Sequence, residues 1–590
     1  MSGEALGTLP EWDLADLYPG MDAPELTRDL ASAEARSRAF EAAYDGKVAS
    51  LDGTSLGAAL AEYEQIQELL GRIGSYSGLI YAADMSDPRI GQFHQTMQER
   101  MTDISSHLIF FTLELNRLDD AALAEKMLAP RLAHYGPWLR DLRVFRPYQL
   151  SDELEKLLHD KYVSGRAAWT RLYDETMASL RFPFDGRELT SAEALNLLSD
   201  RDPEVRRRAA ASLTQVFAAN IRLFALVTNT LAKDKEIEDR WRKYPDPATP
   251  RHLSNQVEPE VVAALAGAVR DAYPRLSHRY YRLKAKWLGM DKLNFWDRNA
   301  PLPADLDRSI PWDEARRTVL EAYGAFSPDL AAIGQRFFDN AWIDAPVKPG
   351  KSPGAFAHPC VPSVHPYLLV NYQGKTRDVM TLAHELGHGV HQVLAGAQGT
   401  LMSDTPLTLA ETASVFGEML TFKALLAAEH DPVRRRLLIA SKVEDMLNTV
   451  VRQTAFYEFE CRVHAARREA ELTPEALGEI WLAVQRESLG PGIELSEGYE
   501  HYWSYIPHFI HSPFYVYAYA FGDCLVNSLY AVYEGAAPGF QQKYLDMLRA
   551  GGTLRHKELL APFNLDASDP AFWQKGLGVI EGLIDQLEAD

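Results

Sequence analysis

The stretch TLAHELGHGVHQ, residues 381–392, constrains the fold more than any other part of the chain. His384 and His388 are four residues apart, so on a helix their imidazoles share one face and lie one turn apart. Both rings can then reach one divalent cation without distortion of the backbone. Apolar residues recur at helical spacing through the same stretch, which predicts an amphipathic helix. The stretch therefore predicts a helix that carries a metal site.

Glu385 lies one step round this helix from His384, too displaced to be a comfortable ligand. It can instead hydrogen-bond a water at the metal, which is the position of the general base in an H-E-x-x-H motif. His391 follows on nearly the same face, but a zinc site needs no fourth protein ligand. We therefore predict Glu385 as a catalytic residue and His391 as a packing or supporting residue.

A catalytic zinc site needs a third protein ligand and keeps a fourth position open. The pattern HExxHxxGxxH would place a third histidine at position 394, which holds Leu394, so that class of site is excluded. The stretch LTLAETASVFGEMLTF, residues 407–422, is apolar at helical spacing and predicts a second helix that carries Glu411. We predict Glu411 as the third ligand, which gives a gluzincin-type set with one Zn²⁺ per chain. Cobalt or manganese could replace zinc in such a set.

Glu418 lies two helical turns after Glu411, on the same face of the predicted second helix. Two interpretations stay open. The carboxylate orients a ligand histidine without binding the metal itself, or it is a partly solvated acid on the helix surface.

A second cluster, HYWSYIPHFIHSPFYVYAYAFG at residues 501–522, is rich in histidine and tyrosine. Peptide hydrolysis passes through a tetrahedral oxyanion, which neutral donors near a metal can stabilise. His508 follows a proline in a predicted loop and is the first candidate for this role, followed by Tyr515 and Tyr517. The alternative for most of these rings is an aromatic helix that packs in the core.

Length and charge limit the class of protein. A chain of 590 residues is too long for one compact core, so two or more lobes are expected. The formal net charge of −21 argues against nucleic acid or an anionic membrane as a partner. No signal peptide and no apolar run of about 18 residues is evident. Three scattered cysteines without a CxxC pair favour reduced thiols, so we expect a cytoplasmic protein.

Helical periodicity dominates the chain, and strand signals are few. Helices are predicted at residues 24–44, 54–82, 88–117, 152–178 and 203–240. Strands are predicted as a hairpin within 180–189, and as 354–359 beside 366–372. We predict a mainly α fold with a small β-sheet beside the H-E-x-x-H helix. The expected domains are an N-terminal helical lobe, 1–200, and a catalytic domain, 201–590.

Three motifs together, HELGHGVH, LAETASVFGE and IPHFIHSPFYVYAYAFG, resemble the oligoendopeptidase F group of the thimet-oligopeptidase-like zinc peptidases. WDLADLYPG near the N-terminus and RQTAFYEFE, residues 452–460, are also similar, so the resemblance spans nearly the whole chain. It implies a two-lobed helical clam-shell, with His384, His388 and Glu411 as zinc ligands and Glu385 as general base.

The resemblance also implies functions for residues outside the metal site. His508 would stabilise the transition state together with a tyrosine of the FYVY segment, Tyr515 or Tyr517. The strand GAFAHP would pair through its backbone with an extended peptide, which makes Gly354, Ala355 and Phe356 candidate substrate-binding residues. The implied activity is hydrolysis of internal bonds in short unstructured oligopeptides.

Other functions on the same site stay open. A carboxypeptidase-type exopeptidase needs a group that holds the terminal carboxylate, and Arg377 or Arg452 could supply it. An aminopeptidase is disfavoured because GAFAHP carries no acid to hold an N-terminal amine. A peptide-binding scaffold without catalysis is disfavoured because it has no need of Glu385. The sequence does not determine the oligomeric state.

Overall fold

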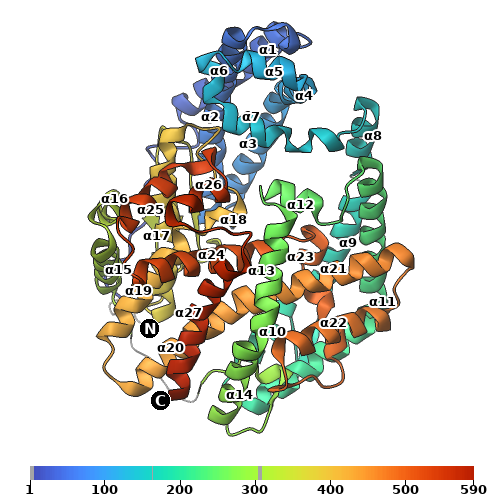
Figure 1. The fold of residues 1–590 in the computed structure, drawn as a ribbon, viewed down its shortest axis with the longest axis vertical. Coiled ribbons are helices and arrows are strands. Elements are labelled where there is room, and N and C mark those ends of the chain that lie inside the picture. Colours follow the sequence, from blue (N-terminus) through green and yellow to red (C-terminus); the bar gives the residue numbers. More distant parts are fainter. Residues whose placement is uncertain (1–5, 163, 303–308, 590) are drawn as a thin grey trace. The chain divides into compact units, whose positions relative to one another are not determined.

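The computed structural model describes residues 6–162, 164–302 and 309–589, which form a mainly α fold with a few short strands (Figure 1). The predicted fold class is thereby confirmed. Two compact units are interleaved along the chain. Unit 1 comprises Met1–Arg146, Leu306–Ala428 and Tyr533–Leu565; unit 2 comprises Pro147–Asp305, Glu429–Val532 and Asp566–Asp590.

These units differ from the consecutive domains, 1–200 and 201–590, that we predict from the sequence. The N-terminal helices up to Arg146 join unit 1, which also contains the H-E-x-x-H helix. Contacts between segments far apart in the chain define a compact unit. The periodicity and composition of the sequence do not reveal such contacts. The division at residue 200 stays a prediction.

Unit 1 is built from helices of three separate chain segments. Its helices are α1 (Pro24–Tyr44), α2 (Gly53–Ala83), α3 (Pro88–Ser106), α4 (Ile109–Arg117), α5 (Asp120–Lys126), α6 (Pro130–His134), α7 (Gly136–Leu142), α15 (Trp312–Phe326), α16 (Pro328–Asp339), α17 (Thr376–Ala395), α18 (Leu407–Ala410), α19 (Ser414–Ala428), α25 (Phe540–Arg549) and α26 (His556–Leu560). Within it, α15, α16, α17 and α19 pack side by side (Figure 1).

Unit 2 contains the longest helix and the histidine- and tyrosine-rich segment. Its helices are α8 (Asp152–Tyr162), α9 (Arg166–Ser179), α10 (Ser191–Asn196), α11 (Pro203–Arg242), α12 (Thr249–Ser254), α13 (Pro259–Ala272), α14 (Ser277–Trp287), α20 (Pro432–Leu447), α21 (Gln453–Glu469), α22 (Pro474–Leu489), α23 (His508–His511), α24 (Tyr517–Glu534, which ends in unit 1) and α27 (Pro570–Ala589).

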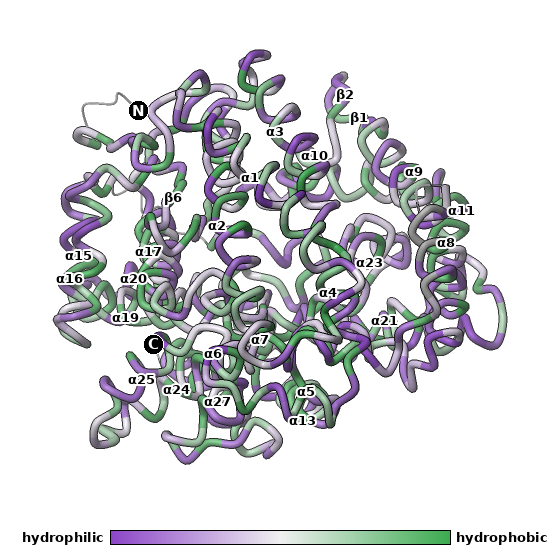
Figure 2. The backbone as a smooth tube through the Cα atoms, turned by 90° about the horizontal axis from the view of Figure 1, so that it is seen from above, coloured by the Kyte–Doolittle hydropathy of each residue, from purple (hydrophilic) through white to green (hydrophobic). Residues whose placement is uncertain are grey.

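Local sequence signals explain where several helices begin. The N-cap Asp52 accepts a hydrogen bond from the backbone N–H of Ser55, and Ser327 caps α16 by accepting from Leu330. The predictions for α1, α2 and α11 are confirmed almost to the residue. The predicted helix 88–117 is wrong as one element, because α3 ends at Ser106 and α4 starts at Ile109. Green and purple alternate along many helices in Figure 2, as expected for amphipathic helices that bury one face.

The strands form three small sheets. β1 (Phe182–Phe184) and β2 (Arg187–Leu189) make the predicted hairpin, and both turn residues between them have positive φ. β3 (Leu293–Asn294) pairs in parallel with β7 (Ile493–Glu494). The third sheet has the order β4-β6-β5, with β4 (Ile343–Asp344), β6 (Tyr367–Leu369) and β5 (Phe356–His358).

This third sheet is the one predicted beside the H-E-x-x-H helix. β5 runs antiparallel to β6, with Phe356 opposite Leu369 and His358 opposite Tyr367, and both strands contact α17. β5 lies at the edge of the sheet. Edge strands in general are where a sheet can add a further extended chain.

Helix α11 is long and apolar enough, by length and composition, to cross a membrane. No other helix in the described part of the chain passes this test. The core helix of a soluble protein passes it equally, and 39% of the apolar window is buried inside the structure. The expectation that the chain has no membrane partner stays a prediction.

Candidate metal centre

Helix α17 carries two candidate ligands on an open face, while its opposite face is buried. Leu382, Leu386 and Val390 are fully buried, whereas the side chains of His384 and His388 keep 27% and 19% of their surface exposed. The helix starts at a capping box, in which the Asp378 carboxylate accepts from the backbone N–H of Lys375. The two rings lie 5.0 Å apart, centroid to centroid.

Glu411 does not lie inside a helix. The single helix predicted over 407–422 is wrong: α18 ends at Ala410, and α19 begins at Ser414. The Thr412 hydroxyl donates to the Leu409 carbonyl at 2.6 Å, and the Ser414 hydroxyl donates to the Glu411 carboxylate at 2.6 Å. Such local side-chain bonds compete with helix formation. The resulting turn presents Glu411 to α17.

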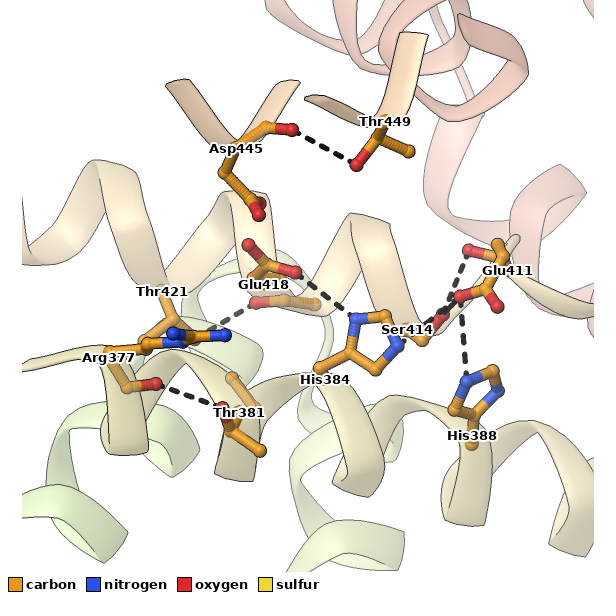
Figure 3. A network of polar contacts seen from close by, with 12 residues as sticks. Arg377, Thr381, His384, His388, Glu411, Ser414, Glu418, Thr421, Asp445 and Thr449 are labelled. Atoms are coloured by element: carbon orange, nitrogen blue, oxygen red, sulfur yellow. Dashed lines mark hydrogen bonds and ion pairs between the residues drawn. The ribbon is translucent and has the colours of Figure 1, made fainter. Parts of the chain in front are cut away.

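The structure brings His384, His388 and Glu411 together (Figure 3). Glu411 Oε2 lies 3.3 Å from His384 Nε2 and 3.5 Å from His388 Nε2. One ligand atom from each residue lies within 4.8 Å of the other two. Two imidazole nitrogens and one carboxylate oxygen are a donor set that suits a catalytic divalent metal.

Glu418 reaches the same site from α19 (Figure 3). Its Oε2 lies 3.1 Å from His384 Nδ1, and its side chain is only 13% exposed. A carboxylate on the outer nitrogen fixes the ring orientation and the tautomer, so that Nε2 faces the metal position. Of the two interpretations that the sequence left open, this geometry favours the orienting residue over the solvated acid.

The electrostatics of the cluster favour a cation between the carboxylates. Burial alone would lower the pKa of His384, but its hydrogen bonds to Glu411 and Glu418 raise it well above the ordinary value. Burial would raise the pKa of Glu411, but the hydrogen bond from His384 and the two imidazoles lower it to about 2. Burial lowers the pKa of His388 to about 4, so this ring is neutral and ready to bind a metal.

Glu385 points to a different neighbour. The residue is 7% exposed, and its carboxylate accepts a hydrogen bond from the backbone N–H of Ala357 in β5. Burial raises the pKa of Glu385 to about 7. The Ala357 carbonyl accepts from Gln392 of α17 at 3.5 Å. Glu385 therefore links the helix that carries His384 and His388 to the main chain of the edge strand.

The predicted substrate-binding residues lie at the start of this strand. Phe356 is the first residue of β5, whereas Gly354 and Ala355 precede it. Asn371 donates to the carbonyl of Gly354 at 2.8 Å and so fixes the approach to the strand. The backbone groups that face α17 belong to Ala357, which the sequence analysis did not single out.

His391 is buried and 6% exposed, and burial lowers its pKa to about 4. This environment agrees with a packing residue. Two further histidines near β5 also have structural partners. His358 lies 2.8 Å from the hydroxyl of Ser75, and His365 stacks on Trp342 at 3.7 Å between ring centroids.

The other predicted catalytic residues belong to unit 2. His508 starts the short helix α23, and its ring stacks on Tyr515 at 5.9 Å between centroids. The hydroxyl of Tyr519 lies 3.4 Å from His508 Nε2. His508, Tyr515 and Tyr519 are all half-buried, and we call these three rings the His508 cluster.

Tyr517 is not part of this cluster. It is 1% exposed, and its hydroxyl contacts His252 Nδ1 at 3.0 Å and accepts from Asn255 at 2.9 Å. A hydroxyl held in the core by two partners is not available to a substrate. We therefore replace Tyr517 by Tyr519 as the second candidate tyrosine. The sequence carries both at helical positions, and only packing separates them.

Gly387 is a residue of the site that sequence reasoning missed. A Cβ atom at this position would lie 2.5 Å from the carbonyl oxygen of Ala413 and 2.7 Å from Cα of Ser414. Both are backbone atoms of the turn that carries Glu411, so α17 and this turn are in direct main-chain contact. The glycine between His384 and His388 is what lets the turn that carries Glu411 approach the helix.

Replacement of Gly387 by alanine is expected to push this turn away from α17. We expect the free energy of unfolding to fall by roughly 1–3 kcal/mol, the range for overpacking, and the affinity for zinc to fall about 10-fold or more. Thermal unfolding and chelator competition measure the two effects. The control is G396A at the C-terminal end of the same helix, where an added Cβ meets nothing nearer than 3.9 Å. If G387A and G396A had the same stability and the same zinc affinity, the close approach of the Glu411 turn to Gly387 would be contradicted.

Comparison with known proteins identifies the family. The model of the family "Peptidase family M3" matches residues 196–579, and a model described as "Oligopeptidase F" matches residues 114–182. Oligopeptidase PepF of Bacillus subtilis is 26% identical over 98% of this chain and 86% of its own length. Group B oligopeptidase PepB of Streptococcus agalactiae is 26% identical over 88% of this chain and 87% of its own length.

Solved structures show the same fold. A structure from Chlamydophila abortus superposes with a TM-score of 0.87 at 22% identity and covers 99% of this chain and all of its own. Oligoendopeptidase-F from Enterococcus faecium gives a TM-score of 0.71 at 22% identity over 96% of this chain and 97% of its own. The resemblance to the oligoendopeptidase F group is thereby confirmed, and with a family model matched over most of its length, this chain belongs to peptidase family M3.

Proposed function

We propose that this M3 peptidase is a zinc-dependent endopeptidase that hydrolyses internal peptide bonds of short unstructured oligopeptides. The observation that carries the proposal is the convergence of His384, His388 and Glu411 beside Glu385 and an edge strand. The names of the relatives, oligopeptidase and oligoendopeptidase, support the substrate class.

The residues fit a catalytic zinc ion. Two imidazoles and one carboxylate supply three ligands, as such sites require, and leave a position for water or substrate. Glu418 on His384 Nδ1 and the hydroxyl of Ser414 on Glu411 are the outer partners that hold zinc ligands in place. Zinc, when bound, polarises the substrate carbonyl and lowers the pKa of water.

Glu385 moves the protons in the proposed reaction. Its carboxylate takes a proton from the attacking water and later delivers it to the leaving amine. The backbone N–H of Ala357 and the burial of the side chain hold the carboxylate in one place. The same N–H ties the general base to the strand that would hold the substrate.

The edge strand gives the proposed substrate an extended conformation. A peptide that adds to the free side of β5 would pair with main-chain groups rather than with particular side chains. Gly354 and Ala355 precede this strand and Phe356 begins it, so these residues would contact the peptide. Such pairing needs an unfolded chain as substrate, which supports oligopeptides over folded proteins.

The His508 cluster is proposed to stabilise the oxyanion of the tetrahedral intermediate. Its imidazole and phenol groups are half-buried donors, which is what this role requires. Burial, the guanidinium of Arg452 and the neighbouring His511 all lower the pKa of His508, which keeps the ring a neutral donor.

A peptide blocked at both ends distinguishes the proposed activity from the alternatives. We expect the zinc-loaded protein to cut an oligopeptide with an acetylated N-terminus and an amidated C-terminus at an internal bond, and mass spectrometry of the products identifies that bond. Removal of one residue only from an unblocked C-terminus would indicate a carboxypeptidase instead. Stoichiometric zinc without cleavage of any member of a peptide library would indicate a binding scaffold.

A further inference from the structure

The chain makes an unusual turn inside the segment that carries the His508 cluster. Phe514, between α23 and α24, has φ of +59°, in the left-handed region that non-glycine residues rarely adopt. Its side chain is 1% exposed and packs on the ring of His464 at 4.8 Å. A strained residue of this kind persists only where its surroundings fix it.

A buried carboxyl fixes this turn. Glu460 of α21 is 2% exposed, and its Oε1 accepts a hydrogen bond from the backbone N–H of Phe514 at 2.8 Å. Its Oε2 has no hydrogen-bond partner among the described residues. Burial raises the pKa of this carboxyl to about 8. A cavity of about 20 Å³, lined in part by Arg166, lies beside it.

Placing a carboxyl group in this environment is unfavourable, so its presence calls for a reason. An apolar side chain would fill the same space without the cost of desolvation. Glu460 is instead the partner that the Phe514 N–H needs once the turn points that group into the core. The Glu460 carboxyl therefore stabilises the backbone of the loop between α23 and α24.

Two arginines hold carbonyl groups of the same loop. Arg166 donates to the Ile510 carbonyl at 2.8 Å, and Arg251 donates to the Pro513 carbonyl at 3.3 Å. Three polar side chains from three helices thus bind the main chain between His508 and Tyr515. The Glu460 carboxyl accepts the hydrogen bond from the Phe514 N–H, at the point where the chain reverses direction.

The turn sets the geometry of the His508 cluster. His508 lies before Phe514, and Tyr515 and Tyr519 lie after it, yet the rings meet. The Tyr515 and Tyr519 centroids are 5.3 Å apart, and Tyr519 reaches His508 Nε2. Rotation at Phe514 would move the two tyrosines relative to the histidine.

We propose that Glu460 is a positioning residue, whose hydrogen bond to Phe514 holds His508, Tyr515 and Tyr519 in the arrangement that stabilises the transition state. This inference rests on the proposed function, in which the His508 cluster acts on the substrate. Glu460 itself touches no substrate. It acts through the backbone of the loop.

The test compares three substitutions in the full-length, zinc-loaded protein. E460M keeps the length of the side chain but removes the acceptor. E460Q keeps an acceptor oxygen, and E460D retains the carboxyl on a chain one methylene shorter. Peptide hydrolysis gives kcat and KM, metal analysis gives zinc content, and hydrogen exchange by mass spectrometry follows residues 506–516.

For E460M we expect kcat to fall about 10- to 100-fold, within the range for a buried backbone N–H left without an acceptor. KM should change by no more than about 3-fold and zinc content not at all, because the bond positions groups that act in the transition state. Exchange of residues 506–516 should be about 10-fold or more faster. E460Q should restore both kcat and exchange to near the wild-type values, and E460D should be intermediate.

Two results would overturn the proposal. The first is E460M with wild-type kcat, whether or not exchange becomes faster; the second is E460Q as impaired as E460M. If E460M does not fold, E460D decides, and wild-type kcat and exchange in that variant overturn the proposal. A wild-type protein that binds zinc and cuts no peptide refutes the proposed function instead, and hydrogen exchange still reports whether Glu460 restrains the loop.

Discussion

Glutamine in place of Glu385 is expected to lower kcat for peptide hydrolysis about 10³-fold, within the range for loss of a general acid–base group. This corresponds to about 4 kcal/mol of transition-state stabilisation. The amide has nearly the same shape and still accepts the hydrogen bond from the Ala357 N–H, but it cannot take up a proton. Zinc should stay bound, because Glu385 is not among the three proposed ligands.

The measurement pairs single-turnover kinetics on a quenched peptide with metal analysis of the same sample. E418Q is the matched control, since it makes the same change in the carboxylate that contacts His384 Nδ1. We expect E418Q to lose zinc affinity about 10- to 100-fold and to recover activity when zinc is added in excess. Excess zinc should not rescue E385Q. Cleavage by E385Q at the wild-type rate would refute proton transfer by Glu385.

Glutamine in place of Glu411 is expected to remove zinc rather than to impair a zinc-loaded enzyme. Its Oε2 lies between the two imidazoles, 3.3 and 3.5 Å from their Nε2 atoms, so the substitution removes both a ligand and a negative charge. We expect affinity to fall by more than about 100-fold, the upper end for loss of an outer partner alone. Activity should fall below detection at zinc concentrations that saturate the wild type.

Competition with a chelator of known affinity measures this effect, and circular dichroism checks the fold. S414A is the control, because it removes only the hydroxyl that donates to Glu411. It should bind zinc more weakly than the wild type and far more tightly than E411Q. Stoichiometric zinc in E411Q at wild-type affinity would show that Glu411 is not a ligand, and the proposed metal centre would fail with it.

The spacing of His384 and His388 was enough to predict that both rings face one point, because helix geometry is local and nearly invariant. The same is true of the hairpin around Asp185 and Gly186, whose turn chemistry is local too. Strand 354–359 beside 366–372 followed from short apolar runs between turn residues, and the structure pairs them in antiparallel register. Local signals of this kind survive folding with little change.

The segment around Glu411 is one place where a prediction from local sequence was wrong. Apolar residues at helical spacing predicted one helix over 407–422, yet the chain leaves the helix at Glu411 and resumes it at Ser414. Contacts far along the chain support this turn: Tyr544 donates to the Thr412 carbonyl at 2.7 Å, and its ring packs on Phe416 at 4.5 Å between centroids. Periodicity contains no information about such partners.

The amino-acid sequence by itself determined the class of fold, the helix with its two histidines and the place of Glu385 beside them, because each depends on residues within a few turns of one another. Only the tertiary structure decided that Glu411 approaches through a turn over Gly387, that Glu418 orients His384, and that Tyr519 rather than Tyr517 reaches His508. Each of these depends on which faces of distant segments pack together. Packing contacts between distant segments are a property of the whole chain and are not written in any one stretch of it.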